Sequence, residues 1–307
     1  MKKKTKALLI LLALLLLLTL PGFYNGLAIR RYTVEAPGIA GPVRIALVTD
    51  LHSCTYGEGQ RELLDAIDKE APDLVLLGGD IFDDDLPDDN AETFLRGIGG
   101  RYPVYYVTGN HEYWSGEAGF ARKMAILEDC GIVRLSGETA TMEVNGSRIA
   151  VCGVDDPYAW ANSYGFTERA EGSFRDQVAQ VAAQAEEGAY TILLTHRPEL
   201  PDVYSQYGFD LVLAGHAHGG QWRIPGILNG LWAPNQGLFP AYAGGRYERG
   251  GTVMIVSRGL ARESTQVPRW YNRPELVIID LQQAGDPPRA SAAYRESSAV
   301  HEGGLSE

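Results

Sequence analysis

The sequence predicts an α/β protein in which two mixed, largely parallel sheets pack as a sandwich flanked by helices, preceded by an N-terminal membrane helix. Three observations support this fold class. Short continuous apolar runs alternate with helix-like segments, an Asn-Gly turn joins two further strands, and a leucine-rich run stands near the N-terminus. With 307 residues, 45% of them apolar, the chain is globular and has room for one large domain or two small ones.

The first 29 residues predict a membrane anchor. Residues 1–6 carry four lysines, and the apolar stretch counted from residue 7 to 29 reaches the roughly 20 residues that a membrane helix needs. The lysines before this stretch, with Arg30 and Arg31 after it, favour a cytoplasmic N-terminus and a single-pass protein of the cell membrane whose main domain lies outside. No clean small-x-small cleavage site follows the apolar core, although residues 26–28 offer a poor one. A cleaved signal peptide with secretion, and the opposite orientation, stay open.

Three further segments follow the anchor. Residues 30–42 are expected to form an extended linker, since residues 32–42 contain two prolines and two glycines. Residues 43–282 are expected to form the main domain. Residues 283–307 are polar and without periodicity, which predicts a disordered tail.

Continuous apolar runs predict strands that are buried on both faces. Five such runs occupy residues 43–49, 74–77, 104–108, 191–194 and 211–214. Helix-like segments at 61–69, 91–98, 117–130 and 167–187 connect or follow them. Strands that alternate with helices predict right-handed crossovers and a largely parallel sheet.

A second group of strands predicts another sheet that packs against the first. Residues 141–144 and 148–152 flank Asn145-Gly146, which is the signature of a tight hairpin turn. Residues 252–256 and 275–280 are also expected to be strands of this β-rich part.

Charge and cysteine usage exclude two classes of protein. A net charge of −12 and a pI near 5.0 argue against general nucleic-acid binding, which needs a basic face. An acidic protein that handles phosphate must obtain positive charge elsewhere, and bound metal ions are one source. Cys54, Cys130 and Cys152 form no CxxC pair, so they indicate neither a disulfide framework nor a thiolate zinc site, and we interpret them as small buried side chains.

Polar side chains follow each of the five buried strands. The segments are Asp-Leu-His at 50–52, Gly-Asp-Ile-Phe-Asp at 79–83, Gly-Asn-His-Glu at 109–112, His196, and Gly-His-Ala-His at 215–218. Because the carboxyl ends of parallel strands meet at one edge of a sheet, where ligands bind, these side chains are expected to converge. Five of the six histidines of the chain belong to this set.

The donor types predict a pair of metal ions. Imidazole and carboxylate groups without thiolates suit manganese, zinc or iron. The set is too large for one ion and sufficient for two, and two ions about 3.5–4 Å apart can activate water and clamp the oxygens of a displacement at phosphorus. Asp80, central in the strand order, is the natural shared ligand.

Five ordered motifs, DLH, GDxxD, GNHE, a lone His and GHxH, resemble those of the calcineurin-like metallophosphoesterase superfamily. GHAHGGQ, SRGL and RWYNRPEL are similar to its membrane-anchored bacterial phosphodiesterase branch. The resemblance covers about residues 43–280. SRGLA departs from the branch, which often has a further glycine there, but it contains no expected ligand.

This resemblance implies a role for each motif residue. One ion would be held by Asp50, His52, Asp80 and His218. The other would be held by Asp80, Asn110, His196 and His216. His111 would stand beside the scissile phosphate without binding metal and protonate the leaving oxygen or stabilise its charge, and Asp83 would orient it. The nucleophile would be a hydroxide that bridges the two ions.

The predicted function is phosphodiester hydrolysis that depends on two divalent ions, with lipid-linked and nucleotide substrates both open. A pyrophosphate hydrolase acting on a nucleotide-linked lipid is one alternative. A non-catalytic, metal-binding membrane scaffold is another, although His111 and Asp83 are not needed merely to hold metal. Glu112 is equally open to a structural and a site role. Candidate phosphate partners are Arg197, Arg223, Arg258 and Arg269.

Two aromatic, turn-rich segments, 157–166 and 221–247, have two interpretations. Their rings either cover sheet edges or form a rim that meets an apolar or membrane-bound substrate. The second interpretation concerns Trp222, Trp232, Phe239 and Tyr242.

Overall fold

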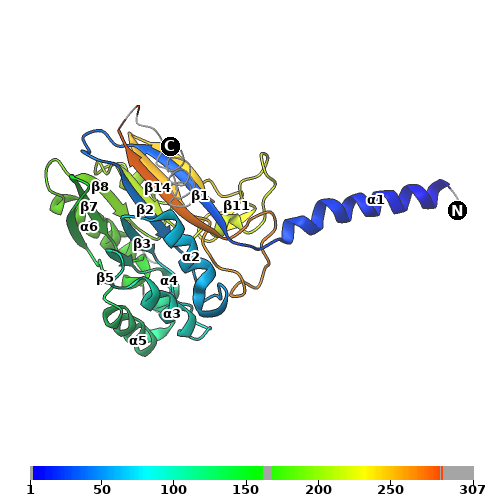
Figure 1. Ribbon diagram of the computed structural model, residues 1–307, viewed down its shortest axis with the longest axis horizontal. Helices are drawn as coiled ribbons and strands as arrows, with labels where there is room; N and C mark the ends of the chain where they lie inside the picture. Colours follow the sequence, from blue (N-terminus) through cyan, green and yellow to red (C-terminus); the bar gives the residue numbers. More distant parts are fainter. Residues whose placement is uncertain (1–2, 162–167, 284, 286–307) are drawn as a thin grey trace, which may run out of the picture.

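Two six-stranded sheets form the centre of the molecule (Figure 1). The computed structural model describes residues 3–161, 168–283 and 285. The first sheet has the order β1 (Ala28–Glu35), β14 (Glu275–Gln282), β2 (Val43–Val48), β3 (Leu74–Gly78), β4 (Val104–Val107) and β5 (Val133–Arg134). The second has the order β12 (Gly245–Arg249), β13 (Thr252–Val256), β9 (Leu211–Ala214), β8 (Tyr190–Leu194), β7 (Ser147–Gly153) and β6 (Glu138–Val144). Most neighbouring strands are parallel, which confirms the predicted fold class.

Helices cover the outer faces of both sheets. α2 (Arg61–Glu70), α3 (Asp89–Ile98) and α5 (Gly116–Asp129) pack on the first sheet, and α6 (Glu168–Gln184) packs on the second. The described residues also form two short helices, α4 (Asn110–Trp114) and α7 (Pro201–Tyr204), and four 3₁₀ turns: η1 (Leu20–Phe23), η2 (Glu58–Gln60), η3 (Pro157–Trp160) and η4 (His218–Gly220).

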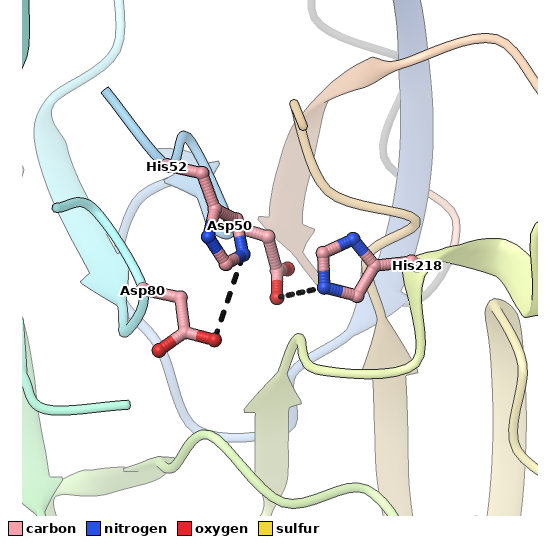
Figure 2. Close-up of side chains that lie close together, drawn as sticks. All are labelled: Asp50, His52, Asp80 and His218. Carbon is pink, nitrogen blue, oxygen red and sulfur yellow. Dashed lines mark ion pairs between the residues drawn. The ribbon is translucent and has the colours of Figure 1, made fainter. Parts of the chain in front are cut away.

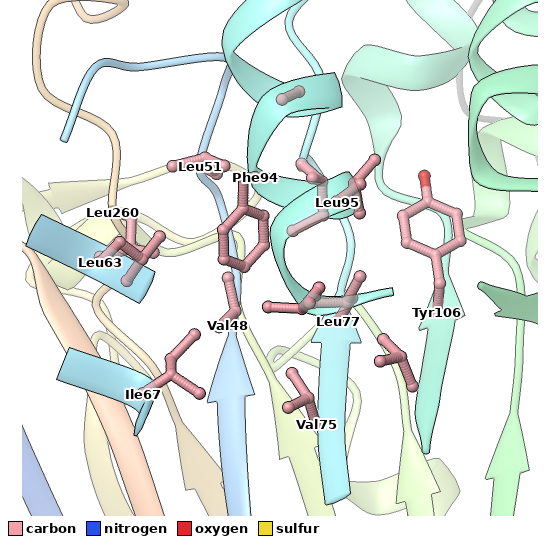
Figure 3. Close-up of a cluster of buried hydrophobic side chains, with 14 of the residues drawn as sticks. Val48, Leu51, Leu63, Ile67, Val75, Leu77, Phe94, Leu95, Tyr106 and Leu260 are labelled. Carbon is pink, nitrogen blue, oxygen red and sulfur yellow. The ribbon is translucent and has the colours of Figure 1, made fainter. Parts of the chain in front are cut away.

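Alternation along the buried strands explains the layers. In β2, Ala46 and Val48 face the helices, and Ile45 and Leu47 face the second sheet. Successive strand residues point to opposite faces, so a continuous apolar run fills both layers at once. Figure 3 shows the helix-side layer, where Phe94 of α3 lies among side chains of β2, β3 and α2. The three cysteines are free and buried, as expected.

The predicted hairpin is confirmed. β6 and β7 pair antiparallel, and Asn145 (φ 51°) and Gly146 (φ 77°) form the turn with positive φ at both positions. This is the geometry of a tight turn that matches the twist of the flanking strands.

The expected division of strands between the sheets is wrong in two places. The five buried strands do not share one sheet, because β2, β3 and β4 lie in the first and β8 and β9 in the second. β14, expected in the second group, instead pairs antiparallel with β2 in the first sheet. Local apolar patterns identify a strand but carry little information about its distant partners.

The expected linker at 30–42 is also partly wrong. β1 begins at Ala28 and pairs in parallel with β14 along its full length, so residues 28–35 belong to the sheet. Its side chains are mostly exposed or half-buried, which explains why no apolar run marked it. The expected tail at 283–307 lies outside the described residues except for 283 and 285.

The N-terminal helix is shorter than expected. α1 (Lys3–Thr19) continues into η1, and Pro21 and Gly22 end it before residue 29. Residues Lys4–Phe23 form a helix that is long and apolar enough to cross a membrane, a property that anchors and signal sequences share. α1 projects away from the two sheets (Figure 1).

Candidate metal centre

The polar loops of both sheets meet at one place. Asp50 and His52 follow β2, Asp80 follows β3, and Asn110 begins α4 after β4; His196 follows β8, and His216 and His218 follow β9. Three groups of side chains among the described residues bring donor atoms within 4.8 Å of one another, and one of them is His52, Asp83 and His111. The other two are Asp50, His52, Asp80 and His218 (Figure 2), and Asp80, His196 and His216. The carboxylate of Asp80 belongs to both of these two groups.

The backbone is strained at this place. A left-handed conformation is uncommon for residues other than glycine and is costly, so it persists mainly at functional sites. Positive φ angles between 47° and 64° occur at Asp50, His52, Asp80, His216 and His218. Close packing reinforces this constraint, since a Cβ at Gly79 (φ 87°) would lie 2.6 Å from His196 Nδ1.

Hydrogen bonds orient two imidazoles toward Asp80. His52 Nδ1 lies 2.8 Å from Asp83 Oδ2, and His196 Nδ1 lies 2.9 Å from the carbonyl oxygen of Gly78. Both partners can only accept, so Nδ1 carries the proton and Nε2 keeps its lone pair in each neutral ring. The Nε2 atoms of His52 and His196 then face Asp80 Oδ2 at 3.6 and 3.1 Å.

Several donor atoms fit a cation and not another protein group. Within the described part of the chain, Asp50 Oδ2, His52 Nε2 and Asn110 Oδ1 are buried and have no hydrogen-bond partner. A buried acceptor without a partner is expensive unless an ion or water satisfies it. Carboxylate oxygens and neutral imidazole nitrogens facing one another are the donor set of divalent metal ions.

The electrostatics of the site agree with this interpretation. Burial raises the pKa of Asp80, but His196 and His111 outweigh it and hold the pKa well below its ordinary value. Burial lowers the pKa of His196, whereas Asp80 and Asp50 raise it to about 10, so the carboxylates favour positive charge at this position. Burial, together with nearby cationic groups, holds the pKa of His216 and His218 well below the ordinary value and keeps both rings neutral.

His111 has a different carboxylate partner from the expected one. Its Nδ1 lies 2.5 Å from Asp84 Oδ1 and 3.8 Å from Asp83 Oδ2. Asp83 Oδ1 accepts the backbone N–H groups of Asp85 and Leu86, while its other oxygen accepts from His52. The turn after β3 therefore directs Asp83 mainly toward His52 and Asp84 toward His111, so Asp84, which the sequence did not single out, makes the shorter contact with His111.

The sequence did not predict two polar neighbours of His216. Asn235 was not among the candidates, and Arg197 was a candidate partner for phosphate. Asn235 Oδ1 lies 2.8 Å from His216 Nε2 and accepts a hydrogen bond of 2.6 Å from Arg197 Nη1. Arg197 also makes two hydrogen bonds, of 2.5 and 2.9 Å, to the carboxylate of Asp156. Asn235 lies in the turn between β10 (Trp232–Ala233) and β11 (Gly237–Leu238), and no sequence pattern marked it.

The other uncertain residues have structural partners. Glu112 accepts backbone N–H groups of Asp80, Ile81 and Gly109 and so joins the loops after β3 and β4. Arg258 pairs with Glu275, Arg223 bonds to Asn229, and Arg269 bonds to the carbonyl oxygen of Ala261.

Two cavities open beside the ligand groups. One, of about 150 Å³, is lined by Asp80, Asn110, His111, Trp114, Tyr158, Arg197, His216, His218, Pro234 and Asn235. The other, of about 170 Å³, is lined by His52, His111, Ala217, His218, Gln221, Trp232, Pro234, Ser264 and Thr265. They share His111, His218 and Pro234, so His111 faces the space on both sides.

Residues 43–220 match the calcineurin-like phosphoesterase family, and the chain belongs to that family. It is therefore a metallophosphoesterase with an Asp/His cluster suited to divalent metal ions.

The chain is similar to proteins from several bacteria. The chain is 28% identical over 249 residues to the uncharacterized protein YpbG of Bacillus subtilis (strain 168), with 78% of this chain and 81% of that protein covered. It is 27% identical over 248 residues to an uncharacterized metallophosphoesterase of Helicobacter pylori (strain J99), with 78% of this chain and 60% of that protein covered. A solved structure, the NAD nucleotidase of Haemophilus influenzae, is similar with a TM-score of 0.49 and 17% identity over 72% of this chain and 46% of that chain.

Proposed function

We propose that the protein is a membrane-anchored phosphodiesterase that works with two divalent ions. The observation that supports this most directly is the position of Asp80, whose carboxylate belongs to two separate groups of buried donors. A carboxylate has two oxygens and a full negative charge, so it can balance two cations held close together.

The first ion would be held by Asp50, His52, Asp80 and His218, and the second by Asp80, Asn110, His196 and His216. Bound divalent ions supply activation of a water molecule and neutralisation of charge at phosphorus. Manganese, zinc and iron all suit a site of imidazole, carboxylate and amide donors. Asp83 and Gly78 hold His52 and His196 in the tautomer that leaves Nε2 free to bind.

His111 is proposed as the proton donor. With its Nδ1 proton directed to Asp84, its Nε2 is available to the leaving oxygen. In the hydrolysis, the oxygen of water bonds to phosphorus and the bond from phosphorus to the leaving oxygen breaks. His111 gives the leaving oxygen a proton from Nε2, and a proton lost from the attacking water restores it.

The cavity charges favour a diester over a monoester. Of the residues that line the two cavities, Arg197 is the one Lys or Arg, and its guanidinium N–H groups already contact Asp156, Asn235 and His216. A diester carries one negative charge, whereas a monoester at neutral pH approaches two and would have the proposed ions as its main cationic partners, with little added by the cavity side chains.

We propose that α1 remains attached as a single-pass anchor, with the domain outside the cell membrane. The residues around the poor cleavage site take part in the fold, because Arg273 donates to the carbonyl oxygens of Gly26 and Leu27, and Ala28 begins β1. The mass of the intact protein isolated from membranes distinguishes this from a secreted, cleaved form.

The test uses the full chain in detergent with added Mn²⁺. Methyl p-nitrophenyl phosphate is the diester and p-nitrophenyl phosphate the monoester, and a chelator removes the metal. The proposal predicts metal-dependent hydrolysis that favours the diester and falls strongly in His111→Gln. Stoichiometric metal binding without turnover of either compound would support the scaffold alternative, and selective cleavage of a nucleotide-linked diphosphate would support the pyrophosphatase.

A further inference from the structure

A third cavity lies next to the metal centre and has no charged wall. It has a volume of about 380 Å³ and is lined by Gly220, Gln221, Trp222, Leu231, Trp232, Gln266 and Val267. Gln221 and Trp232 also line the cavity that contains His52 and His111. A molecule in the metal centre can therefore extend past Trp232 into this space, which we call the apolar cavity.

The wall of the apolar cavity is hydrogen-bonded to the segment that holds the end of α1. Trp270 donates its ring N–H to the carbonyl oxygen of Thr19 in α1, at 3.0 Å, and its backbone N–H to Gln221, at 3.1 Å. Tyr271 adds a hydrogen bond from its hydroxyl to Leu18. Trp270 also pairs through its backbone with Trp222. One residue thus contacts both the last turn of α1 and the cavity wall, so the cavity lies where α1 joins the domain.

The surface around this cavity is unusually apolar. Beyond Tyr24, ten large hydrophobic side chains of the described residues are exposed, and seven of them lie between residues 222 and 267. We call these seven the apolar rim: Trp222, Ile224, Ile227, Trp232, Leu238, Phe239 and Val267. Ile227 is 84% exposed, and Leu238 and Phe239 are each 66% exposed.

The apolar rim is a continuous structure that reaches the metal centre. Leu231 donates its backbone N–H to Trp222, and Phe239 donates to Leu231, so three chain segments lie side by side. The hairpin of β10 and β11 carries Trp232 and Leu238 in the rim and Asn235 beside His216. In Figure 1 this part of the chain lies on the side from which α1 projects.

We propose that the apolar cavity takes the hydrocarbon chain of a lipid phosphodiester drawn from the bilayer that α1 enters. This inference rests on the proposed function, and it names the substrate class of the same site. Exposed apolar patches of this kind mark membrane or partner contacts, and tryptophan rings are favoured at the membrane interface. The attachment of α1 favours a membrane contact over a protein partner, because a helix that enters a bilayer brings the rim beside it to the bilayer surface.

The test compares two substrates that differ only in chain length. Methyl p-nitrophenyl phosphate and hexadecyl p-nitrophenyl phosphate have the same leaving group and the same phosphorus chemistry. Full-length protein is placed in phosphatidylcholine nanodiscs with Mn²⁺, and kcat/KM is measured for both. The ratio of the hexadecyl to the methyl value is expected to be about 50-fold or more, since burial of only three methylene groups supplies that much.

A matched pair of variants separates the cavity from simple partition into the membrane. Val267→Glu places a charge in the cavity wall, whereas Val133→Glu changes a valine of equal exposure, 49%, on β5 at the far edge of the first sheet. If the long chain acts only by drawing the substrate into the nanodisc bilayer, the ratio of the hexadecyl to the methyl kcat/KM is raised equally in both variants. The inference predicts that Val267→Glu lowers the ratio at least about 10-fold and that Val133→Glu keeps the wild-type ratio.

Three results would overturn the inference. Hydrolysis of the methyl diester with a ratio near one removes the lipid substrate but leaves the proposed function intact. No metal-dependent hydrolysis of either compound removes both proposals. A dimer that Val267→Glu dissociates while the ratio is unchanged identifies the apolar rim as an interface between two copies of the chain.

Discussion

The carboxyl edge of the first sheet and that of the second contribute different chemistry to one site. The loops after β2 and β3 supply the carboxylates Asp50, Asp80 and Asp83. The loops after β8 and β9 supply imidazoles, His196, His216 and His218, with no carboxylate among the donors within reach. Negative charge is therefore concentrated on one wall, and the other wall offers nitrogen donors. Asp80 lies where the two walls meet.

Substitutions on the two walls should therefore have different effects on metal binding. Loss of a carboxylate would remove charge that the proposed ions need, whereas loss of an imidazole would remove one proposed ligand from one ion. The first sheet also carries His111 and its partner Asp84, so the proposed proton transfer belongs to the acidic wall.

The largest effect is expected for Asp80→Asn. The substitution preserves shape but removes the charge shared by both donor groups, so both ions should bind weakly. Charge stabilisation by metal is worth several kcal/mol, and at about 1.36 kcal/mol per tenfold kcat/KM should fall by about 10⁴-fold. Steady-state kinetics with a diester, beside the metal content of the purified variant, measure this. Retained activity with both ions bound would mean that Asp80 does not join the two walls.

His111→Gln should cost less and act differently. A positioned proton donor contributes about 10²–10⁴-fold, and His111 is in neither of the two donor groups that share Asp80, so kcat should fall by that factor with the metal content unchanged. A substrate whose leaving group needs no proton, such as a dinitrophenyl diester, should restore part of the loss. A loss of metal in this variant would instead identify His111 as a ligand.

Asp83→Asn and Asp84→Asn form a matched pair of neighbours with separate effects. Asp83 contacts the proposed ligand His52, so its substitution should weaken metal binding by roughly 10–100-fold. Asp84 contacts His111, so its substitution should lower kcat by a similar factor while metal binding is retained. Identical phenotypes for the two variants would contradict the assignment of one carboxylate to each imidazole.

The smallest effect is expected for substitution of Asp68, a carboxylate of α2 that lies away from the site. Partial burial raises the pKa of Asp68, but hydrogen bonds from Arg101 and Tyr102 outweigh it and lower the pKa below its ordinary value of 3.8. A depressed pKa in the folded state stabilises the protein above that ordinary value, and the stabilisation is lost as the pH falls through the folded-state pKa. Because the group is partly exposed and screened by solvent, Asp68→Asn should cost about 0.2–1 kcal/mol at neutral pH. Urea unfolding at pH 7 and pH 3 checks this, with unchanged diester hydrolysis as the control.

The sequence predicted that these polar loops meet at one place, because each stands next to a local signal, a short apolar run followed at once by Asp, Asn or His. It did not predict that the strands belong to two sheets, since pairing such as β14 with β2 joins residues more than 200 positions apart. β1 was missed because its exposed side chains leave no apolar run.

The partners of the ligands were harder to predict than the ligands. Asp83, Asp84 and Asp85 are equivalent in sequence, and only the turn that Asp83 caps decides which carboxylate reaches His111. Asn235 reaches His216 from a hairpin with no distinctive motif. Arg197 was a candidate for phosphate, but the carboxylate of Asp156, 41 positions earlier, accepts hydrogen bonds from Nε and Nη2 along one edge of its guanidinium.

Counting bound ions tests the central claim most directly. Equilibrium dialysis with Mn²⁺ on the wild-type protein, Asp50→Asn and His196→Gln compares one ligand from each wall, each from a different proposed ion site. We predict two ions per chain in the wild type and one in each variant, because Asp80 continues to serve the remaining site. A single ion in the wild type that both substitutions remove would contradict a centre of two ions built from both sheets.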